Sequence, residues 1–436
     1  MLGIMQDWPL TVNKILEHAK RINPTREIIT RRVEGHIVRT TYANLFDQSK
    51  QVSNALIDSG IQLGDRVATL GWNSERHMAS WYGAMGIGAV LHTINPRLHP
   101  EQVAWIANHA EDKVLIFDKT CIAIVEDLKH NLHIRNAFVI YADADTMPEN
   151  SLGAIPFDIW IDGRSTEVRW GDFPEDTACG LCYTSGTTGD PKGVLYSHRS
   201  NVLHTLITMG KDVMGMGADD VVLPVVPMFH ANAWGLPFAC PAVGAKLVLP
   251  GRYADGASLA RFIANESVTI AVGVPTVWLG LMDHLERTGE ELPSLRRIMV
   301  GGAAMSPSLM ERIERRGIRV QTTWGMTEIS PLGTAMPPTA GTRLPSASGR
   351  PAIGIDLMLT DASGKALDQQ RGAQGHLWVR GPSVVERYLG QAEPVTDDGW
   401  FDTGDLARID ECGILTITGR AKDLIKSGGE WINPAE

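Results

Sequence analysis

The sequence lacks the features of a secreted, membrane-spanning or nucleic-acid-binding protein. Cysteine is scarce, with 5 in 436 residues, and an odd number of scattered cysteines does not build a disulfide framework. No run of about 18 apolar residues suggests a membrane span, and the first ten residues lack the basic start and apolar core of a secretory signal. The formal net charge of -10 argues against non-specific nucleic-acid binding, which needs a basic face. We therefore expect a cytoplasmic protein with no membrane span and no nucleic-acid partner.

The chain is long enough for more than one hydrophobic core. Hydrophobic residues make up 44% of the sequence and charged residues 21%, a composition typical of soluble globular proteins. At 436 residues, two or three layered units are expected. Helix and strand patterns alternate over residues 42–59, 66–70 and 74–86. This rhythm predicts an α/β fold.

The domain organisation is predicted from changes in pattern and composition. Gly, Pro, Thr and Ser are frequent over residues 333–350, which predicts an exposed loop there. Residues 27–41 predict a β-hairpin around Glu34 and Gly35. We expect α/β subdomains at residues 1–180 and 181–345, a small β-barrel-like subdomain at 346–418, and a hinge leading into a further domain at 419–436.

Cys179 and Cys182 form a C-x-x-C pattern. They lie in an apolar segment that predicts a buried strand, and no second pair supplies further ligands for a metal. Core packing is therefore expected, rather than redox or metal chemistry.

Residues 183–194 are the most informative segment of the chain. Glycines at positions 186, 189 and 193 allow positive φ and close backbone approach, so that several N–H groups can converge on one anion. The spacing is not that of a Walker A loop, because Pro191 stands before Lys192 where that motif requires Gly. The segment predicts a polyphosphate-binding loop of another kind. The residues expected to hold the phosphates are Thr184, Ser185, Gly186, Thr187, Thr188, Gly189 and Lys192.

Three more motifs follow along the chain, at residues 322–328, 400–405 and 419–430. Together with the loop at 183–194, they resemble the signatures of the acyl-adenylate-forming superfamily, which includes acyl-CoA synthetases, peptide-synthetase adenylation domains and beetle luciferases. The resemblance covers essentially the whole chain and extends to medium- and long-chain fatty acyl-CoA synthetases, including methylmercaptopropionate-CoA ligase-like members. It implies an enzyme that uses ATP, Mg²⁺ and coenzyme A to convert a carboxylic acid into its acyl-AMP and then its acyl-CoA.

Acyl-adenylate formation requires a carboxylate to attack the α-phosphate of ATP, so positioning and electrostatics dominate catalysis. The resemblance implies that Thr184 holds the β- and γ-phosphates and that Thr327 reaches the α-phosphate. It also implies that Glu328 holds Mg²⁺, with Thr184 as a second metal ligand. A carboxylate beside three phosphates is repelled without a cation, so this role for Glu328 requires the metal. A helix-start residue is the structural alternative for Glu328.

Adenine binding needs a flat, apolar slot with backbone partners. Trp324 offers a π face, although many members of the family have Tyr at this position. The resemblance implies that Asp405 accepts hydrogen bonds from both ribose hydroxyls, with help from Arg420. Outside the loop at 183–194, the residues expected to bind the nucleotide are Gly302, Ala303, Ala304, Thr323, Trp324, Gly325, Met326, Thr327, Asp405 and Arg420.

Residues 227–234 resemble the segment through which the acyl group enters fatty acyl-CoA synthetases, and we call them the acyl-access segment. The resemblance implies that His230 helps to place the carboxylate and that Trp234 is a gate opened by ATP. A core histidine and a core tryptophan are the structural alternatives. The residues expected to contact the acid are His230, Trp234, Val274, Pro275, Thr276, Trp278, Gly301 and Gly302.

The end of the sequence leaves two functional alternatives open. In the family, the motif at Gly419 and Arg420 leads into a C-terminal domain that carries a catalytic lysine, and we expect that domain to be missing from this sequence. Lys422 falls at the family's hinge, and the pair Gly428 and Gly429 is expected to let pantetheine pass. A nucleotide- and acyl-binding unit with little turnover is therefore an alternative to a complete ligase.

The substrate also stays open at this stage. An aryl-acid CoA ligase of the same superfamily is an alternative to an aliphatic or thioether acid ligase, because only the pocket lining separates them. A luciferase-like oxygenase would use the same adenylate, but nothing in the sequence marks that chemistry. The expected partners are a small carboxylic acid, ATP and coenzyme A, and a homodimer is left open.

Overall fold

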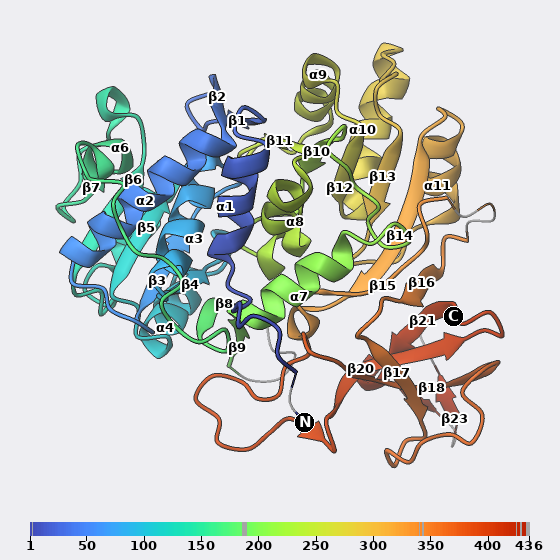
Figure 1. Ribbon diagram of the computed structural model, residues 1–436. Coiled ribbons are helices and arrows are strands. Elements are labelled where there is room, and N and C mark those ends of the chain that lie inside the picture. The colour runs from blue at the N-terminus through green and yellow to red at the C-terminus, as the bar shows by residue number, and fades with distance from the viewer. Residues whose placement is uncertain are drawn as a thin grey trace. The chain divides into compact units, whose positions relative to one another are not determined.

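The computed structural model describes residues 1, 3–184, 190–339, 341, 344–423, 425–427 and 430–432. Ser185, Gly186, Thr187, Thr188 and Gly189, which are predicted to bind phosphate, lie outside the described residues. The chain divides into two compact units (Figure 1). We call Met1–Thr205 with Pro227–Arg252 the N-terminal unit, and Leu206–Val226 with Tyr253–Glu436 the C-terminal unit.

The N-terminal unit is a parallel sheet with helices and an additional β-hairpin. Its helices are α1 Asn13–Ile22, α2 Tyr42–Asp58, α3 Glu75–Gly86, α4 Pro100–His109, α5 Ile122–Leu128, α6 Phe157–Ile161, most of α7 His198–Thr208, and α8 Leu236–Val243. Its strands are β1 Glu27–Arg31, β2 Ile37–Thr41, β3 Arg66–Leu70, β4 Val90–Thr93, β5 Val114–Asp118, β6 Ala137–Tyr141, β7 Ile155–Pro156, β8 Ala178–Thr184, β9 Lys192–Ser197 and β11 Lys246–Leu249.

Seven of these strands form one sheet in the order β7-β6-β5-β3-β4-β8-β9. The pairs from β6 to β8 are parallel, and β9 runs antiparallel to β8. Strands β4 and β5 are buried along their whole length, as is usual for parallel strands covered on both faces. Helices α2 and α3 pack against each other (Figure 1), and Ser74 caps α3 by accepting a hydrogen bond from the His77 N–H.

The C-terminal unit combines a parallel and an antiparallel part in one sheet. Its helices are α9 Gly256–Glu266, α10 Pro275–Thr288 and α11 Pro307–Glu314. Its strands are β10 Val221–Pro224, β12 Ile270–Gly273, β13 Arg297–Val300, β14 Arg319–Gly325, β15 Leu332–Ala335, β16 Ala347–Pro351, β17 Asp356–Thr360, β18 Ala373–Arg380, β19 Thr396–Asp397, β20 Trp400–Ile409, β21 Leu415–Arg420, β22 Ile425–Ser427 and β23 Glu430–Ile432.

Within this unit the strand order is β17-β18-β20-β21-β16-β15-β14-β13-β12-β10. Strands β10, β12, β13 and β14 are parallel, whereas β15 pairs antiparallel with β14 and begins the antiparallel part. The predicted α/β fold and the hairpin at 27–41 are confirmed. The finer division of the chain into four segments stays a prediction. Among the described residues, no helix is both long and apolar enough to cross a membrane.

The prediction of an exposed loop over residues 333–350 is wrong at both ends. Strands β15 and β16 occupy these ends and pair antiparallel, with Ala335 opposite Arg350, and residues 332–336 are buried. Gly349 has a φ of 91°, and a Cβ added there would lie 1.9 Å from the backbone carbon of Ala335. The small residues that suggested a loop instead allow two backbones to approach closely.

A buried carboxylate lies at the carboxyl end of β5. Asp118 is 5% exposed and accepts hydrogen bonds from the Thr120 N–H at 2.9 Å and the Thr120 hydroxyl at 2.7 Å. Burial, together with the nearby Glu34 carboxylate, raises the pKa of Asp118 to about 6, against the opposing effects of Thr120 and Lys119. The folded state therefore favours the protonated form of Asp118 more than the unfolded chain does.

We expect Asp118→Asn to stabilise the protein at alkaline pH. Because the folded pKa is raised, wild-type stability from this group is complete below about pH 4 and is lost as the pH rises through 6. Asn keeps the acceptor for Thr120 without the charge, so the gain should be about 2–3 kcal/mol at pH 8 and about half of that at pH 5. Calorimetric melting at both pH values measures it, with the exposed Asp127→Asn as control. A gain that does not change with pH would contradict this assignment.

Candidate functional site

The C-terminal unit contains a pocket of about 460 Å³ beside the carboxyl ends of β13 and β14. Ligands of open α/β sheets commonly bind at this end of parallel strands. The volume lies in the range of small-molecule sites. The pocket is lined by Val300, Gly302, Ala303, Ala304, Met305, Thr322, Thr323, Trp324, Gly325, Pro345, Ser346, Ala347, Ser348, Asp405, Ile417, Thr418, Gly419, Arg420 and Asp423. Eight of the ten residues predicted to bind the nucleotide outside the loop at 183–194 are therefore brought together in this pocket. The other two, Met326 and Thr327, are not among the lining residues.

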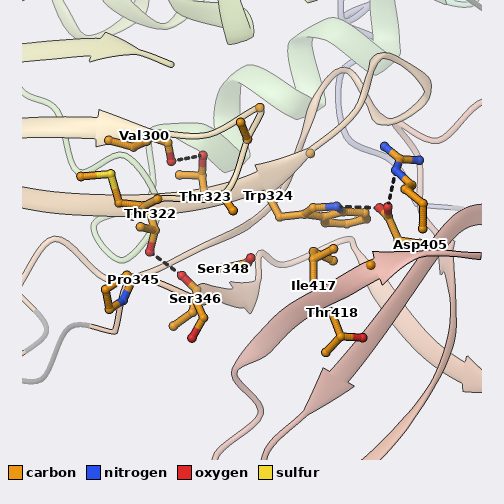
Figure 2. Close-up of a pocket in the computed structure, with 18 of the residues that line it drawn as sticks. Val300, Thr322, Thr323, Trp324, Pro345, Ser346, Ser348, Asp405, Ile417 and Thr418 are labelled. Carbon is orange, nitrogen blue, oxygen red and sulfur yellow. Dashed lines mark hydrogen bonds and ion pairs between the residues drawn. The ribbon is translucent and has the colours of Figure 1, made fainter. Parts of the chain in front are cut away.

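Trp324, Asp405 and Arg420 form a hydrogen-bonded group in this pocket, and Figure 2 shows the contact between Trp324 and Asp405. The indole N–H of Trp324 donates to Asp405 Oδ2 at 2.9 Å, and Arg420 Nε lies 2.8 Å from Asp405 Oδ1. Asp405 and Arg420 are placed opposite each other by the antiparallel pairing of β20 and β21. A carboxylate has about four acceptor positions, so Asp405 keeps capacity for further donors.

The electrostatic state of Asp405 follows from its burial. Its 2% exposed side chain is desolvated, which raises its pKa, while Arg420 and the Trp324 N–H act in the opposite direction. The indole N–H is a contact that the sequence did not predict, since Trp324 was assigned only a stacking role. A Tyr at this position would present no indole N–H to Asp405.

Two glycines shape the backbone around Trp324. A Cβ at Gly333 would lie 2.6 Å from the Trp324 ring, and a Cβ at Gly325 would lie 1.9 Å from the Pro331 oxygen. Glycine at these positions therefore lets the indole and the following turn pack closely against backbone.

Thr327 and Glu328 lie in a short turn after β14 and are 6% and 7% exposed. The Val385 N–H donates to the Glu328 backbone oxygen at 2.7 Å, and the Tyr388 hydroxyl donates to Glu328 Oε1 at 3.0 Å. Tyr388 has no motif signal in the sequence, and only the structure brings it to Glu328.

In the N-terminal unit, the predicted phosphate loop is the connection of a β-hairpin. Thr184 is the last residue of β8, Lys192 is the first of β9, and the two lie opposite each other in the register. Lys192 is exposed. The hairpin holds both ends of the loop at one edge of the sheet.

The strand that leads into this loop makes polar contacts on both faces, at the surface on one face and in the interior on the other. On one face the Tyr183 hydroxyl lies 2.6 Å from His109 Nδ1, and the buried His92–Asp112 pair lies nearby. On the other face the Cys182 thiol contacts Thr93 Oγ1 at 3.2 Å and Asn232 Oδ1 at 3.8 Å. These contacts join residues far apart in the sequence, which explains why sequence patterns did not reveal them.

The expected packing role of the C-x-x-C pair is confirmed. Cys179 and Cys182 are buried free thiols, and desolvation raises the pKa of both. A raised pKa keeps a thiol protonated and unreactive.

The acyl-access segment contains a turn of left-handed helix. The φ angles of Ala231, Asn232, Ala233 and Trp234 are 43°, 53°, 47° and 56°, a conformation that costs about 1–2 kcal/mol per residue for L-amino acids. His230 is exposed and Trp234 is half-buried. Gly235 follows with a φ of 77°, and a Cβ there would lie 3.0 Å from the His204 ring.

The other predicted acid-binding residues belong to the C-terminal unit. Val274 precedes α10 and is half-buried, as is Pro275, and Thr276 is exposed. Trp278 is fully buried, donates its indole N–H to the Gly273 oxygen at 3.2 Å, and packs so closely that a Cβ at Gly273 would lie 2.7 Å from its ring. Gly301 is buried and is not among the residues lining the pocket.

The chain belongs to the AMP-binding enzyme family, whose profile matches residues 16–389. The family membership inferred from the four motifs is thereby confirmed.

Its relatives include several CoA ligases. The chain is 44% identical to the 3-methylmercaptopropionyl-CoA ligase of Ruegeria lacuscaerulensis, over 100% of this chain and 83% of the relative. It is 42% identical to the medium-chain-fatty-acid–CoA ligase of Ectopseudomonas oleovorans, over 100% of this chain and 82% of the relative. Among solved structures, an anthranilate CoA ligase in complex with anthranoyl-AMP has a TM-score of 0.88 and 26% identity, covering 99% of this chain and 82% of that chain.

Proposed function

We propose that the protein is an ATP-dependent acid:CoA ligase that forms an acyl-AMP and then an acyl-CoA. The observation that carries the proposal is the pocket lined by Trp324, Asp405 and Arg420 in a chain of the AMP-binding enzyme family. A flat aromatic side chain and a carboxylate with free acceptor capacity suit an adenine ring and a ribose. The substrates would be a carboxylic acid, ATP and coenzyme A.

The acid is proposed to be a medium- or long-chain fatty acid or a similar aliphatic or thioether acid. The names of the two relatives at 44% and 42% identity support this class. An aryl acid is the second candidate, because the solved anthranilate CoA ligase has the same fold. A cytoplasmic location and a homodimer stay predictions.

Two group transfers make up the proposed reaction. In the first, a carboxylate oxygen bonds to the α-phosphorus of ATP while the bond to the bridging oxygen breaks and pyrophosphate leaves. In the second, the sulfur of coenzyme A, having lost its proton, bonds to the acyl carbon and AMP leaves. We propose that Thr184, Lys192 and Thr327 hold the phosphates during the first transfer and that His230 orients the acid.

Magnesium is proposed to bind at Glu328. Mg²⁺ is usually held by one or two carboxylates together with substrate phosphates, and the buried carboxylate of Glu328, next to Thr327 in the chain, fits that pattern. Over the residues that the structure describes, no group of three or more His, Cys, Asp or Glu side chains could hold a metal. The bound cation would offset phosphate charge.

The proposal is tested by pyrophosphate release with a panel of acids. Aliphatic acids of increasing length, 3-methylmercaptopropionate, and aryl acids such as anthranilate are each supplied with ATP, Mg²⁺ and coenzyme A. We expect release with aliphatic or thioether acids, since each buried methylene contributes about 0.8 kcal/mol. Release only with aryl acids would favour the second candidate, and no release with any acid would contradict the proposal.

We expect Trp234→Ala to let the acid bind without ATP. If Trp234 closes the channel in about nine of ten molecules without ATP, acid binding is weakened about tenfold. Alanine is too small to close the channel, so the variant should lose this effect. The indole of Trp234 is half-buried, and its backbone lies in a strained left-handed turn. Such strain is frequent in the switch regions of proteins. Calorimetric titration with an acid series, with and without a nonhydrolysable ATP analogue, measures the change.

The control for this prediction is Trp8→Ala, which removes an indole that is 59% exposed and lies outside the acyl-access segment. In this control, as in the wild type, the acid should bind more tightly when the ATP analogue is present. Equal acid affinity for wild type and Trp234→Ala, with and without the analogue, would assign Trp234 a packing role.

A further inference from the structure

Tyr388 reaches the Glu328 carboxylate from a segment with no predicted function. Its hydroxyl donates to Glu328 Oε1 at 3.0 Å, and both residues are 7% exposed. Two more hydrogen bonds join the same parts of the chain. The Val385 N–H donates to the Glu328 oxygen at 2.7 Å, and the Ser330 hydroxyl donates to the Ser383 oxygen at 2.9 Å.

The donor to Glu328 Oε1 is neutral, which matters for a cation site. A phenol ordinarily has a pKa of about 10, so the Tyr388 hydroxyl is neutral near pH 7 and donates a hydrogen bond to Glu328 Oε1 at 3.0 Å. Such a bond orients the carboxylate without cancelling its charge, whereas a Lys or Arg in the same place would compete with a metal ion. Groups that orient metal ligands through hydrogen bonds contribute strongly to metal affinity.

We propose that Tyr388 is a positioning residue that holds the Glu328 carboxylate in the orientation in which it receives the magnesium of MgATP. The inference rests on the proposed function, because it requires that Glu328 bind this metal. Tyr388 itself contacts neither ATP nor the metal in this proposal. Its effect passes through the 3.0 Å hydrogen bond.

Tyr388→Phe tests the inference, since it keeps the ring and removes only the hydroxyl. Calorimetric titration with ATP is carried out in EDTA and in excess Mg²⁺, and the ratio of the two Kd values gives the affinity gained from the metal. We expect this gain to fall roughly tenfold in Tyr388→Phe, while the Kd in EDTA stays as in the wild type. Ser330→Ala is the matched control, because it removes the neighbouring bond to Ser383 and leaves Glu328 Oε1 bonded.

A double variant separates positioning from general loosening of the fold. If Tyr388 acts through Glu328, adding Tyr388→Phe to Glu328→Gln should cause no further loss of the metal-dependent gain. If Tyr388→Phe keeps the full metal-dependent gain in ATP affinity, or if Ser330→Ala loses as much of it, the inference is overturned. The proposed magnesium site would not be affected by either result. A full gain in Glu328→Gln would instead overturn the proposed magnesium site on which the inference depends.

Discussion

Glu328→Gln is expected to lower the kcat for acyl-CoA formation by about 10²–10³-fold and to raise the Mg²⁺ concentration needed for half-maximal rate. Removing one group that stabilises charge in a transition state typically has an effect of this size. Gln has the shape of Glu and keeps an oxygen that can accept from the Tyr388 hydroxyl. The expected loss therefore comes from the missing charge rather than from altered packing.

The measurement is steady-state turnover over a range of Mg²⁺ concentrations. Glu386→Gln is a suitable control, because it removes an exposed carboxylate from the segment that also carries Tyr388. It should change neither the kcat nor the Mg²⁺ requirement. A Glu328→Gln variant with wild-type turnover and wild-type Mg²⁺ dependence would show that the metal binds elsewhere.

Asp405→Ala is expected to weaken ATP binding by about 1.5–3 kcal/mol, which corresponds to roughly 10- to 150-fold in Kd. The substitution removes a buried charged acceptor from the proposed ribose hydroxyls. It also leaves the Trp324 N–H without its acceptor and Arg420 without its ion-pair partner. Because burial raises the pKa of Asp405, wild-type ATP affinity should fall as the pH drops through that raised pKa, and the variant should lack this dependence.

Calorimetric ATP titration between neutral and mildly acidic pH tests both parts of the prediction. Asp402→Ala removes an exposed carboxylate from the same strand, β20, and should bind ATP as the wild type does. If Asp405→Ala and the wild type have the same Kd at each pH, the nucleotide does not contact Asp405.

Local patterns were sufficient to predict several individual elements. The helix predicted at 74–86 is confirmed, and the structure begins α3 at Glu75 after Ser74, whose side chain caps it. The buried strand that leads into the phosphate loop follows from an apolar run and is confirmed as β8, whereas its antiparallel pairing with β9 was not predicted. These elements depend on neighbouring residues, which a single sequence shows directly.

Composition misled the prediction at residues 333–350 for a physical reason. Small residues are common in exposed loops, but they are also needed where two backbones nearly touch, as at Gly349 and Ala335. The sequence cannot separate these cases, because the second backbone comes from another part of the chain. The structure buries Trp278 against Gly273, and its predicted contact with the acid stays a prediction.

The sequence by itself determined the family, the α/β class and the order of the motifs, because these follow from residue types at short spacings. Only the tertiary structure decided which side chains meet. Trp324 and Asp405 are 81 positions apart and share a hydrogen bond, and Tyr388 reaches Glu328 across 60 positions. Such contacts depend on strand order and register, as in the pairing of β20 with β21. Strand order is set by how the buried faces pack together, and this packing has no signature in the local sequence.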